Sequence, residues 1–282
     1  MPEKAMKVTF WGTRGSIAVP GRDTALYGGN TTCLQVELGT EETVIIDAGT
    51  GIRRLGERLL KENGHKSIHL LMTHVHWDHI IGFPFFGPAL SSEIDMYVDG
   101  HPRCMNGLKH TFDTPMGGGF FPIRLEDIRA RMTFLKTVSR KALELEGAVI
   151  DSMPLKHPQG SLGFRFRGGG RTFVFFTDNE LRDEKEVDRY VRFCEGADLL
   201  IHDAQYTPEE IGTKQGWGHS DYEKALDLAH KAGVRRLVLF HHDPGHSDAD
   251  LEGAEVLCRE AVSGRGWDMT VEAAREDDTI VV

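Results

Sequence analysis

A short cluster of histidine and aspartate after an apolar run constrains the fold of this chain more than any other sequence feature. The run Ile68–Thr73 has the composition of a buried strand, and His74, His76, Asp78 and His79 follow it. These residue types are ligands that a borderline divalent metal prefers. In extended backbone His74 and His76 project to the same side, whereas Asp78 and His79 follow a turn and can face a second ion. The pattern predicts a metal site at a strand end, in preference to a surface histidine cluster or a hydrogen-bonded core network.

Apolar runs rich in β-branched and aromatic residues recur along the chain, with helical spacing between some of them. The predicted strands are Lys7–Trp11, Thr32–Leu38, Thr43–Asp47, Ile68–Thr73, Asp95–Val98, Met132–Val138, Leu143–Met153, Leu162–Arg167, Thr172–Thr177, Asp198–Ile201, Arg236–Phe240 and Met269–Ala273. The predicted helices are Ile52–Leu60, ending at Gly64, then Glu184–Cys194, a segment from the capping box Ser220–Glu223 to Gly233, and Asp248–Val262. This order predicts α+β layers, with sheets back to back and helices outside.

The composition of the chain limits the classes of protein to which it can belong. The chain has 282 residues, 40% of them hydrophobic, and its 33 Lys and Arg against 43 Asp and Glu give a formal net charge of −10. These values are typical of a soluble globular protein with enough chain for a stable core. The acidic balance argues against binding long nucleic acid through its phosphates, since that mode needs a positive face. A short or cyclic nucleotide is still compatible with this charge.

The remaining composition signals concern the compartment. The four cysteines, Cys33, Cys104, Cys194 and Cys258, form no CxxC pair, which fits a reducing cytoplasm. The sequence has no apolar window long enough to span a membrane and no signal-peptide core, so we expect neither export nor membrane binding. The oligomeric state is left open, with a homodimer among the alternatives.

The longest irregular stretch covers residues 83–121. Glycine and proline cluster in it around Gly117–Pro122, and Phe83–Phe86 is apolar. Long loops in compact domains are either functional or simple connections. We therefore expect either a lid over a site or a surface connection without a role.

The motif His74, His76, Asp78 and His79 resembles the signature of the metallo-β-lactamase superfamily. The resemblance implies a four-layer αββα sandwich with a two-metal site at one edge of the sheets, in a single domain over residues 1–282. Later segments match the family in order, and the matching residues are His157, Asp178 and His241.

The resemblance also implies a division of ligands between two divalent ions. One ion is assigned His74, His76 and His157, the other Asp78, His79 and His241, and Asp178 is assigned to both. Two neighbouring cations need an anionic bridge to offset their repulsion. Zinc is the preferred metal and manganese the next, because histidine and aspartate accept both. His242 competes with His241, which is favoured because it directly follows the apolar strand.

Other segments resemble the ribonuclease Z branch of the superfamily. An aspartate at position 178, where true β-lactamases carry cysteine, argues against that activity. Asp203 and Gly218–Asp221 resemble the branch's acidic residue and histidine segment, which implies an Asp203–His219 pair near the metals. The branch's transfer-RNA enzymes carry a long basic arm where residues 158–177 lie here, and this arm is absent. The expected substrate is therefore a small phosphodiester.

These resemblances lead to one preferred activity and two alternatives. The preferred activity is hydrolysis of a cyclic nucleotide or cyclic phosphate by a hydroxide that the two ions share. Asp78 is expected to orient or deprotonate the water, and His219, with Asp203 behind it, to assist the leaving group. The first alternative is hydrolysis of a lactone or thioester at the same site. The second is a metal-binding module without catalysis.

Three further residues are candidates for the surroundings of the site. Asp47 follows a buried strand and is expected to accept a hydrogen bond from the second nitrogen of a ligand histidine. Arg14 could supply a cation to a phosphate. Asn30 lies in a glycine-rich segment that also resembles the small phosphodiesterases. The alternative is that the segments around Arg14 and Asn30 are ordinary hairpin turns. Side chains alternate along a strand, so the side chain of His202 is expected to point away from that of its neighbour Asp203.

Overall fold

The computed structural model describes residues 5–62, 66–104, 106, 122 and 124–282. Its strands form two seven-stranded sheets, with the orders β14-β1-β2-β3-β4-β5-β6 and β13-β12-β11-β10-β9-β8-β7. In the first sheet the strands are β1 (Lys7–Gly12), β2 (Cys33–Glu37), β3 (Glu42–Ile46), β4 (Ser67–Met72), β5 (Asp95–Gly100), β6 (Arg131–Phe134) and β14 (Thr279–Val281). In the second they are β7 (Leu143–Leu145), β8 (Ala148–Leu155), β9 (Ser161–Gly168), β10 (Arg171–Phe176), β11 (Leu199–Asp203), β12 (Arg236–Phe240) and β13 (Thr270–Ala273).

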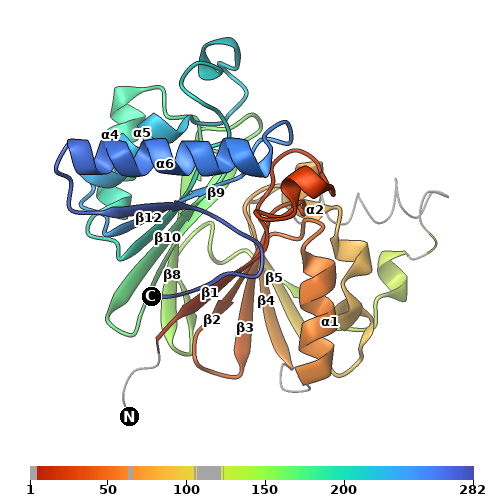
Figure 1. Ribbon diagram of the computed structural model, residues 1–282. Helices are drawn as coiled ribbons and strands as arrows, with labels where there is room; N and C mark the ends of the chain where they lie inside the picture. Colours follow the sequence, from red (N-terminus) through yellow and green to blue (C-terminus); the bar gives the residue numbers. More distant parts are fainter. Residues whose placement is uncertain (1–4, 63–65, 105, 107–121, 123) are drawn as a thin grey trace.

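Helices cover the outer face of each sheet (Figure 1). Helix α1 (Ile52–Glu62) lies against the first sheet, and α4 (Glu184–Cys194), α5 (Tyr222–Lys231) and α6 (Asp248–Gly264) lie against the second. The short helix α2 (Trp77–Ile80) follows β4 near the junction of the two sheets. The predicted αββα sandwich is therefore confirmed.

Strand β10 shows why the sequence folds into layers. Phe173 and Phe175 point into the core between the two sheets, while Val174 and Phe176 pack against the outer helices. Side chains alternate across a strand, so a strand buried on both faces reads as a continuous apolar run. The ring of Phe175 meets Phe240 of β12 edge to face, with centroids 5.5 Å apart.

Strand direction brings the functional residues to one edge. Strands β3, β4, β5 and β6 pair in parallel, as do β10, β11, β12 and β13. Parallel strands end on the same side of a sheet, and residues that follow their carboxyl ends gather there. The motif after β4 thus lies near the ends of β10 and β12, which are far away in sequence.

Some sequence expectations were wrong in detail. The predicted strand Leu143–Met153 is a hairpin of β7 and β8, because Gly147 with φ of 91° turns the chain. The capping residue of α5 is Asp221, whose carboxylate accepts from the Lys224 backbone, and not Ser220. Strand β14 was not predicted, because three residues carry too little pattern.

The described part of the stretch 83–121 has regular structure. It forms two short 3₁₀ turns, at Phe83–Phe85 and Gly87–Leu90, and then β5. Phe83 and Phe86 are buried against α1 and the first sheet, whereas Phe85 is 55% exposed, so only part of the apolar segment belongs to the core. Residues 105, 107–121 and 123 lie outside the described residues, and with them the second part of the expected lid. Among the described helices, none has the length and apolar character needed to cross a membrane.

Replacing Phe175 by alanine should destabilise the protein, because the cavity would open between the two sheets. We expect a loss of about 3–5 kcal/mol in the free energy of unfolding, measured by denaturant titration. Val281→Ala, at a side chain that is 61% exposed, should change it by less than about 0.5 kcal/mol. Equal effects of the two substitutions would show that the inter-sheet core is not formed as described.

Candidate metal centre

The candidate site lies where strands of both sheets end. Asp47 follows β3, Asp178 follows β10 and His241 follows β12. All three have left-handed backbone, with φ of 61°, 56° and 62°. This conformation is uncommon for residues with a side chain, and it persists only where the surroundings enforce it. Strained backbone at three strand ends therefore marks this edge as a candidate functional site.

The predicted ligands come together in two groups. Within each group the ligand atoms lie within 4.8 Å of one another. The first group is His74, His76, His157 and Asp178, and the second is Asp78, His79 and His241. A further set of possible ligand atoms overlaps with both and consists of Asp178, His219 and His241. This division matches the one that the sequence resemblance implied.

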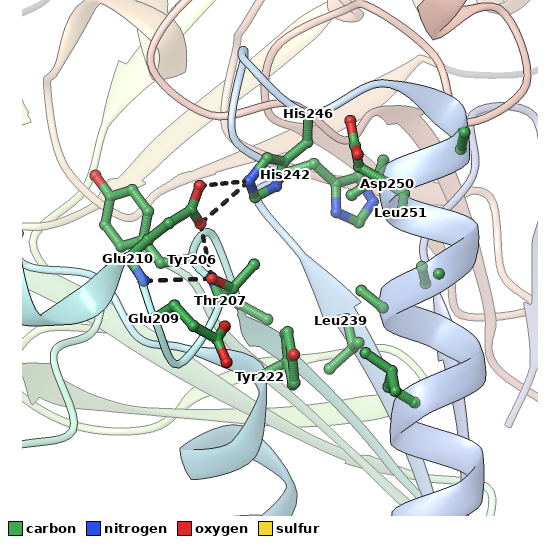
Figure 2. A pocket seen from close by; sticks show the side chains of 16 residues that line it. Tyr206, Thr207, Glu209, Glu210, Tyr222, Leu239, His242, His246, Asp250 and Leu251 are labelled. Atoms are coloured by element: carbon green, nitrogen blue, oxygen red, sulfur yellow. Dashed lines mark hydrogen bonds and ion pairs between the residues drawn. The ribbon is translucent and has the colours of Figure 1, made fainter.

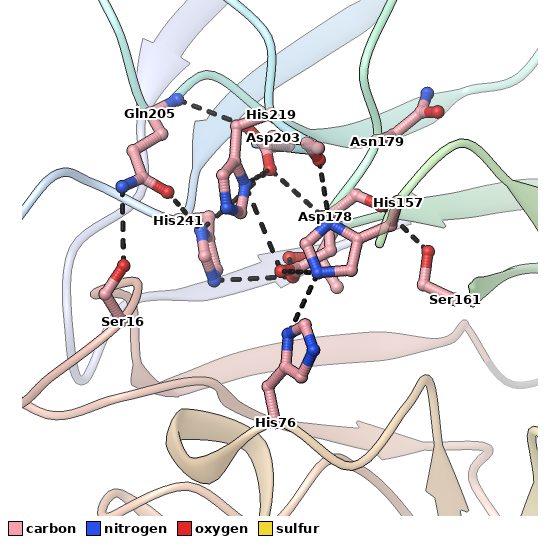
Figure 3. A network of polar contacts seen from close by, with 12 residues as sticks. Ser16, His76, His157, Ser161, Asp178, Asn179, Asp203, Gln205, His219 and His241 are labelled. Carbon is pink, nitrogen blue, oxygen red and sulfur yellow. Dashed lines mark hydrogen bonds and ion pairs between the residues drawn. The ribbon is translucent and has the colours of Figure 1, made fainter. Parts of the chain in front are cut away.

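Asp178 lies between the two groups, and Figure 3 shows it close to His157 of the first and His241 of the second. Its Oδ1 is 3.4 Å from His157 Nε2 and 3.6 Å from His74 Nε2. Its Oδ2 is 3.1 Å from His79 Nε2 and 3.3 Å from His241 Nε2. Burial alone would raise the pKa of this carboxyl, but the imidazoles around it hold the pKa well below its usual range. Each carboxylate oxygen thus faces a different group.

Every histidine of the two groups uses one ring nitrogen for an outside partner and turns the other toward its group. The anchoring contacts are His74 Nδ1 with Thr73 Oγ1 at 3.0 Å, His76 Nε2 with Gln159 Oε1 at 2.6 Å, His79 Nδ1 with Asp47 Oδ2 at 2.8 Å, His157 Nδ1 with the Gly218 carbonyl at 2.9 Å, and His241 Nδ1 with Gln205 Oε1 at 3.1 Å. Such contacts fix the tautomer and the direction of a metal-binding imidazole.

The inward nitrogens fit a divalent cation. In the described part of the chain, His74 Nε2 and His79 Nε2 are buried and form no hydrogen bond. His79 Nε2 nevertheless lies 3.2 Å from Asp78 Oδ2 and close to Asp178. Buried polar atoms without partners are costly, and a cation held by imidazole nitrogens and carboxylate oxygens would satisfy them. The donor set is the one that zinc and similar metals accept.

Asp203 and His219 form the predicted pair beside these groups. His219 Nδ1 is 2.6 Å from Asp203 Oδ2, so the shorter acid reaches the histidine. Burial alone would lower the pKa of His219, but the carboxylates, Asp203 foremost, raise the pKa to about 9. Asp203 also accepts hydrogen bonds from the backbone amides of Asp178 and Ser220. One buried acid therefore orients the histidine and fixes the turn that carries Asp178.

The residues predicted to surround the candidate ligands differ in whether the structure places them at the site. Asp47 is fully buried and binds His79 and the backbone amide of Thr73, as predicted. Arg14 is also fully buried, and its guanidinium donates to the carbonyl groups of Gly28, Asp243 and His246, not to the site.

Asn30 is likewise engaged elsewhere. Its Nδ2 donates to Glu276 Oε2 at 2.9 Å, and its Oδ1 accepts from Thr50 Oγ1 at 3.0 Å. Arg14 and Asn30 thus hold the N-terminal loops together instead of facing a phosphate.

Two neighbouring histidines are excluded from the groups. His242 Nε2 contacts the Ala274 carbonyl at 2.9 Å, and burial lowers the pKa of His242 to about 3, so His241 is the member of the set. His202 Nδ1 contacts the Asp203 carbonyl oxygen at 2.6 Å and its Nε2 contacts Asn179, away from the Asp203 carboxylate as predicted.

A separate cavity of about 490 Å³ lies between α6 and the segment that follows β11 (Figure 2). Tyr206, Tyr222 and Leu239 contribute to its walls, and Glu210 contacts His246 Nε2 across it at 3.0 Å. None of the predicted metal ligands lines this cavity. It is therefore distinct from the candidate metal centre.

Sequence reasoning missed the residues that position the groups from a distance. The Ser16 backbone amide donates to Asp78 Oδ2 at 2.8 Å, and Gln205 contacts His241 Nδ1 while its Nε2 donates to Asp243 Oδ2 at 3.0 Å. Gly15 lies against the His241 ring, where an added Cβ would come within 2.4 Å of ring atoms. The glycines of the Gly12–Ser16 segment were a signal for close approach, but no pattern singled out Gln205.

Comparison with known proteins agrees with the family resemblance of the sequence motifs. Residues 42–242 match the model of the beta-lactamase superfamily domain. The chain belongs to the metallo-β-lactamase superfamily. Together with the histidine and aspartate groups, this membership makes it a metal-dependent hydrolase.

Relatives and solved structures cover nearly the whole chain. Ribonuclease Z of Natronomonas pharaonis is 26% identical over 84% of this chain and 87% of its own length. The metallo-beta-lactamase fold protein YhfI from Bacillus subtilis has a TM-score of 0.72 at 20% identity and 99% coverage of both chains. A diphosphatase from the PhnP family has a TM-score of 0.67 at 20% identity and covers 98% of this chain and 97% of its own. The resemblance to the ribonuclease Z branch is confirmed.

Gln205→Leu should weaken metal binding, because His241 would lose the hydrogen bond that directs its Nε2. We expect the affinity for Zn²⁺ to fall roughly 10- to 100-fold in a chelator-competition titration. Gln215→Leu, at an exposed side chain, is the matched control and should leave the affinity unchanged. Unaltered affinity in the Gln205 variant would mean that His241 needs no such support.

Proposed function

We propose that this protein is a phosphodiesterase with two divalent metal ions. His74, His76 and His157 would hold one ion, Asp78, His79 and His241 the other, and Asp178 would contact both. The opposed distances of Asp178 Oδ1 and Oδ2 to the two groups support this assignment. Zinc is the preferred metal, with manganese next, since imidazole and carboxylate suit both.

The contact between Asp203 and His219 is the observation that favours phosphodiester hydrolysis over acyl hydrolysis. With Nδ1 fixed by Asp203, Nε2 of His219 is the nitrogen available to a substrate. The ring lies beside both groups, with centroids 5.1 Å from His157 and 5.0 Å from His241. The carboxylate of Asp203 raises the pKa of this imidazole and so favours its protonated form. His219 can therefore stabilise a phosphoryl oxygen or give its proton to a departing alkoxide.

Asp78 is placed to act on the attacking water. Its Oδ2 accepts from the Ser16 amide and lies 3.1 Å from His241 Nε2, which fixes the carboxylate in the second group. When bound, divalent cations supply Lewis-acid activation of water and of phosphoryl oxygens. Asp78 would then orient that water or accept its proton while His219 serves the opposite, leaving side.

The size of the substrate is the finer part of the proposal. We favour a small phosphodiester, such as a cyclic nucleotide or cyclic phosphate, because residues 158–177 only join β8 to β10 through β9 and form no basic arm. The net charge of −10 also disfavours long nucleic acid. The relatives named ribonuclease Z favour a second candidate, cleavage of RNA. A transfer-RNA precursor therefore belongs in any substrate test.

Metal analysis and a substrate panel should test the activity together. We expect about two metals per chain and cleavage of bis(p-nitrophenyl) phosphate and cyclic nucleotides, with chelation abolishing turnover. The panel should include a transfer-RNA precursor, a p-nitrophenyl acyl ester and a lactone. Cleavage of the acyl substrates alone would overturn the phosphodiesterase proposal and leave Asp203 and His219 without their assigned roles. Preference for the precursor would replace the small substrate with RNA.

His219→Gln should affect substrates according to their leaving group. Loss of the proton donor should lower kcat by roughly 10²- to 10⁴-fold for a phosphodiester with an alkyl leaving group. A p-nitrophenyl ester needs no protonation to depart, so its kcat should fall much less. His230→Gln is the control, since His230 is exposed and stacks on Trp267. Equal losses for both leaving groups would assign His219 to stabilising a phosphoryl oxygen instead of proton transfer.

A further inference from the structure

The segment between β11 and α5 carries an exposed aromatic side chain beside the candidate metal centre. Trp217 is 56% exposed and lies two residues before His219. The metal-centre chemistry described above does not involve this ring.

The backbone on either side of Trp217 is fixed to the site. The Gly216 amide donates to both carboxylate oxygens of Glu180, at 3.0 and 3.1 Å, and Glu180 is buried two residues after Asp178. The Gly218 carbonyl binds His157 Nδ1, and a Cβ on Gly218 would come within 2.1 Å of that nitrogen. Both glycines have left-handed backbone, with φ of 82° and 90°. The backbone on both sides of Trp217 is therefore held by residues that adjoin predicted ligands.

A cation accompanies the ring. Lys214 Nζ lies 4.4 Å from the centroid of the Trp217 ring and 5.6 Å from that of Tyr206. Tyr206 in turn meets the His219 ring edge to face, with centroids 6.0 Å apart. Trp217, Lys214 and Tyr206 thus form a continuous series of contacts that ends at His219.

We propose that Trp217 and Lys214 form a platform for the base of a nucleoside phosphodiester. This inference rests on the proposed phosphodiesterase function and narrows its substrate from any small phosphodiester to one that carries a nucleobase. An exposed aromatic ring stacks on the π face of a base, and a neighbouring cation suits both the base and its phosphate. The fixed backbone holds the ring in place before the substrate arrives, which lowers the entropy cost of binding.

Two substrates with the same leaving group separate this platform from the chemistry. They are the p-nitrophenyl ester of thymidine monophosphate and methyl p-nitrophenyl phosphate, which differ in the nucleoside. The measured quantity is the ratio of their kcat/KM values. We expect wild-type protein to prefer the thymidine ester, and Trp217→Leu to lower that ratio on the order of 5- to 100-fold, because base stacking contributes about 1–3 kcal/mol. Trp217→Phe, which keeps an aromatic face, should retain most of the preference.

Binding without turnover gives a second readout. Adenosine monophosphate should quench the tryptophan fluorescence of the Zn²⁺-loaded wild-type protein, and Trp217→Phe should remove that quenching. Lys214→Met should weaken the nucleotide binding.

A nucleoside preference that is absent in the wild type, or equal in the wild type and Trp217→Leu, would overturn the platform while leaving the phosphodiesterase proposal intact. If neither ester is cleaved, the phosphodiesterase proposal fails. The fluorescence titration then decides on the platform alone, with loss of quenching in Trp217→Phe supporting it and unchanged quenching overturning it.

Discussion

Each imidazole has two nitrogens, and the architecture of this protein depends on how they are divided. One nitrogen binds a partner in the surrounding structure, which leaves the other directed at a shared point. Asp178 lies between the two groups, and each of its carboxylate oxygens faces one of them. Holding so many polar atoms inside the protein is costly unless something satisfies them together. The two sheets, their parallel strands and the strained strand ends are the means by which the chain keeps these atoms in place.

The partners that hold the imidazoles come from all parts of the chain. Asp47 at the end of β3 fixes His79, and Gln205 after β11 fixes His241. Asp203 links the Asp178 turn to His219, so the positions of the Asp178 carboxylate and of the His219 ring depend on one buried acid. A change at Asp203 would therefore disturb the proposed metal binding and the proposed proton transfer together. The site is better described as one connected network than as separate ligands and helpers.

The features that could be predicted from the sequence are those that leave a local pattern in it. The candidate ligands could be found because their motifs come after apolar runs and match the family in order, and the αββα layers because strands such as β10 are apolar on both faces. Arg14 was misjudged, since the sequence cannot tell a guanidinium buried among carbonyl groups from one that faces a phosphate. Gln205 was missed because its partners His241 and Ser16 are 36 and 189 positions away. Contacts of that kind exist only once the sheets are packed.

The pairing of β14 with β1 has a consequence for how the chain could be rearranged. Val281 lies opposite Lys7, so the last strand completes the same sheet that the first strand begins. Strand β1 runs from there toward Gly12, beyond which Ser16 reaches Asp78. The two described ends of the chain are thus neighbours at the end of β1 away from the metal centre. Joining them by a short linker and opening the backbone in an outlying turn would leave every candidate ligand and its anchoring partner in place, because proximity in the folded sheets, and not order along the chain, brings these residues together.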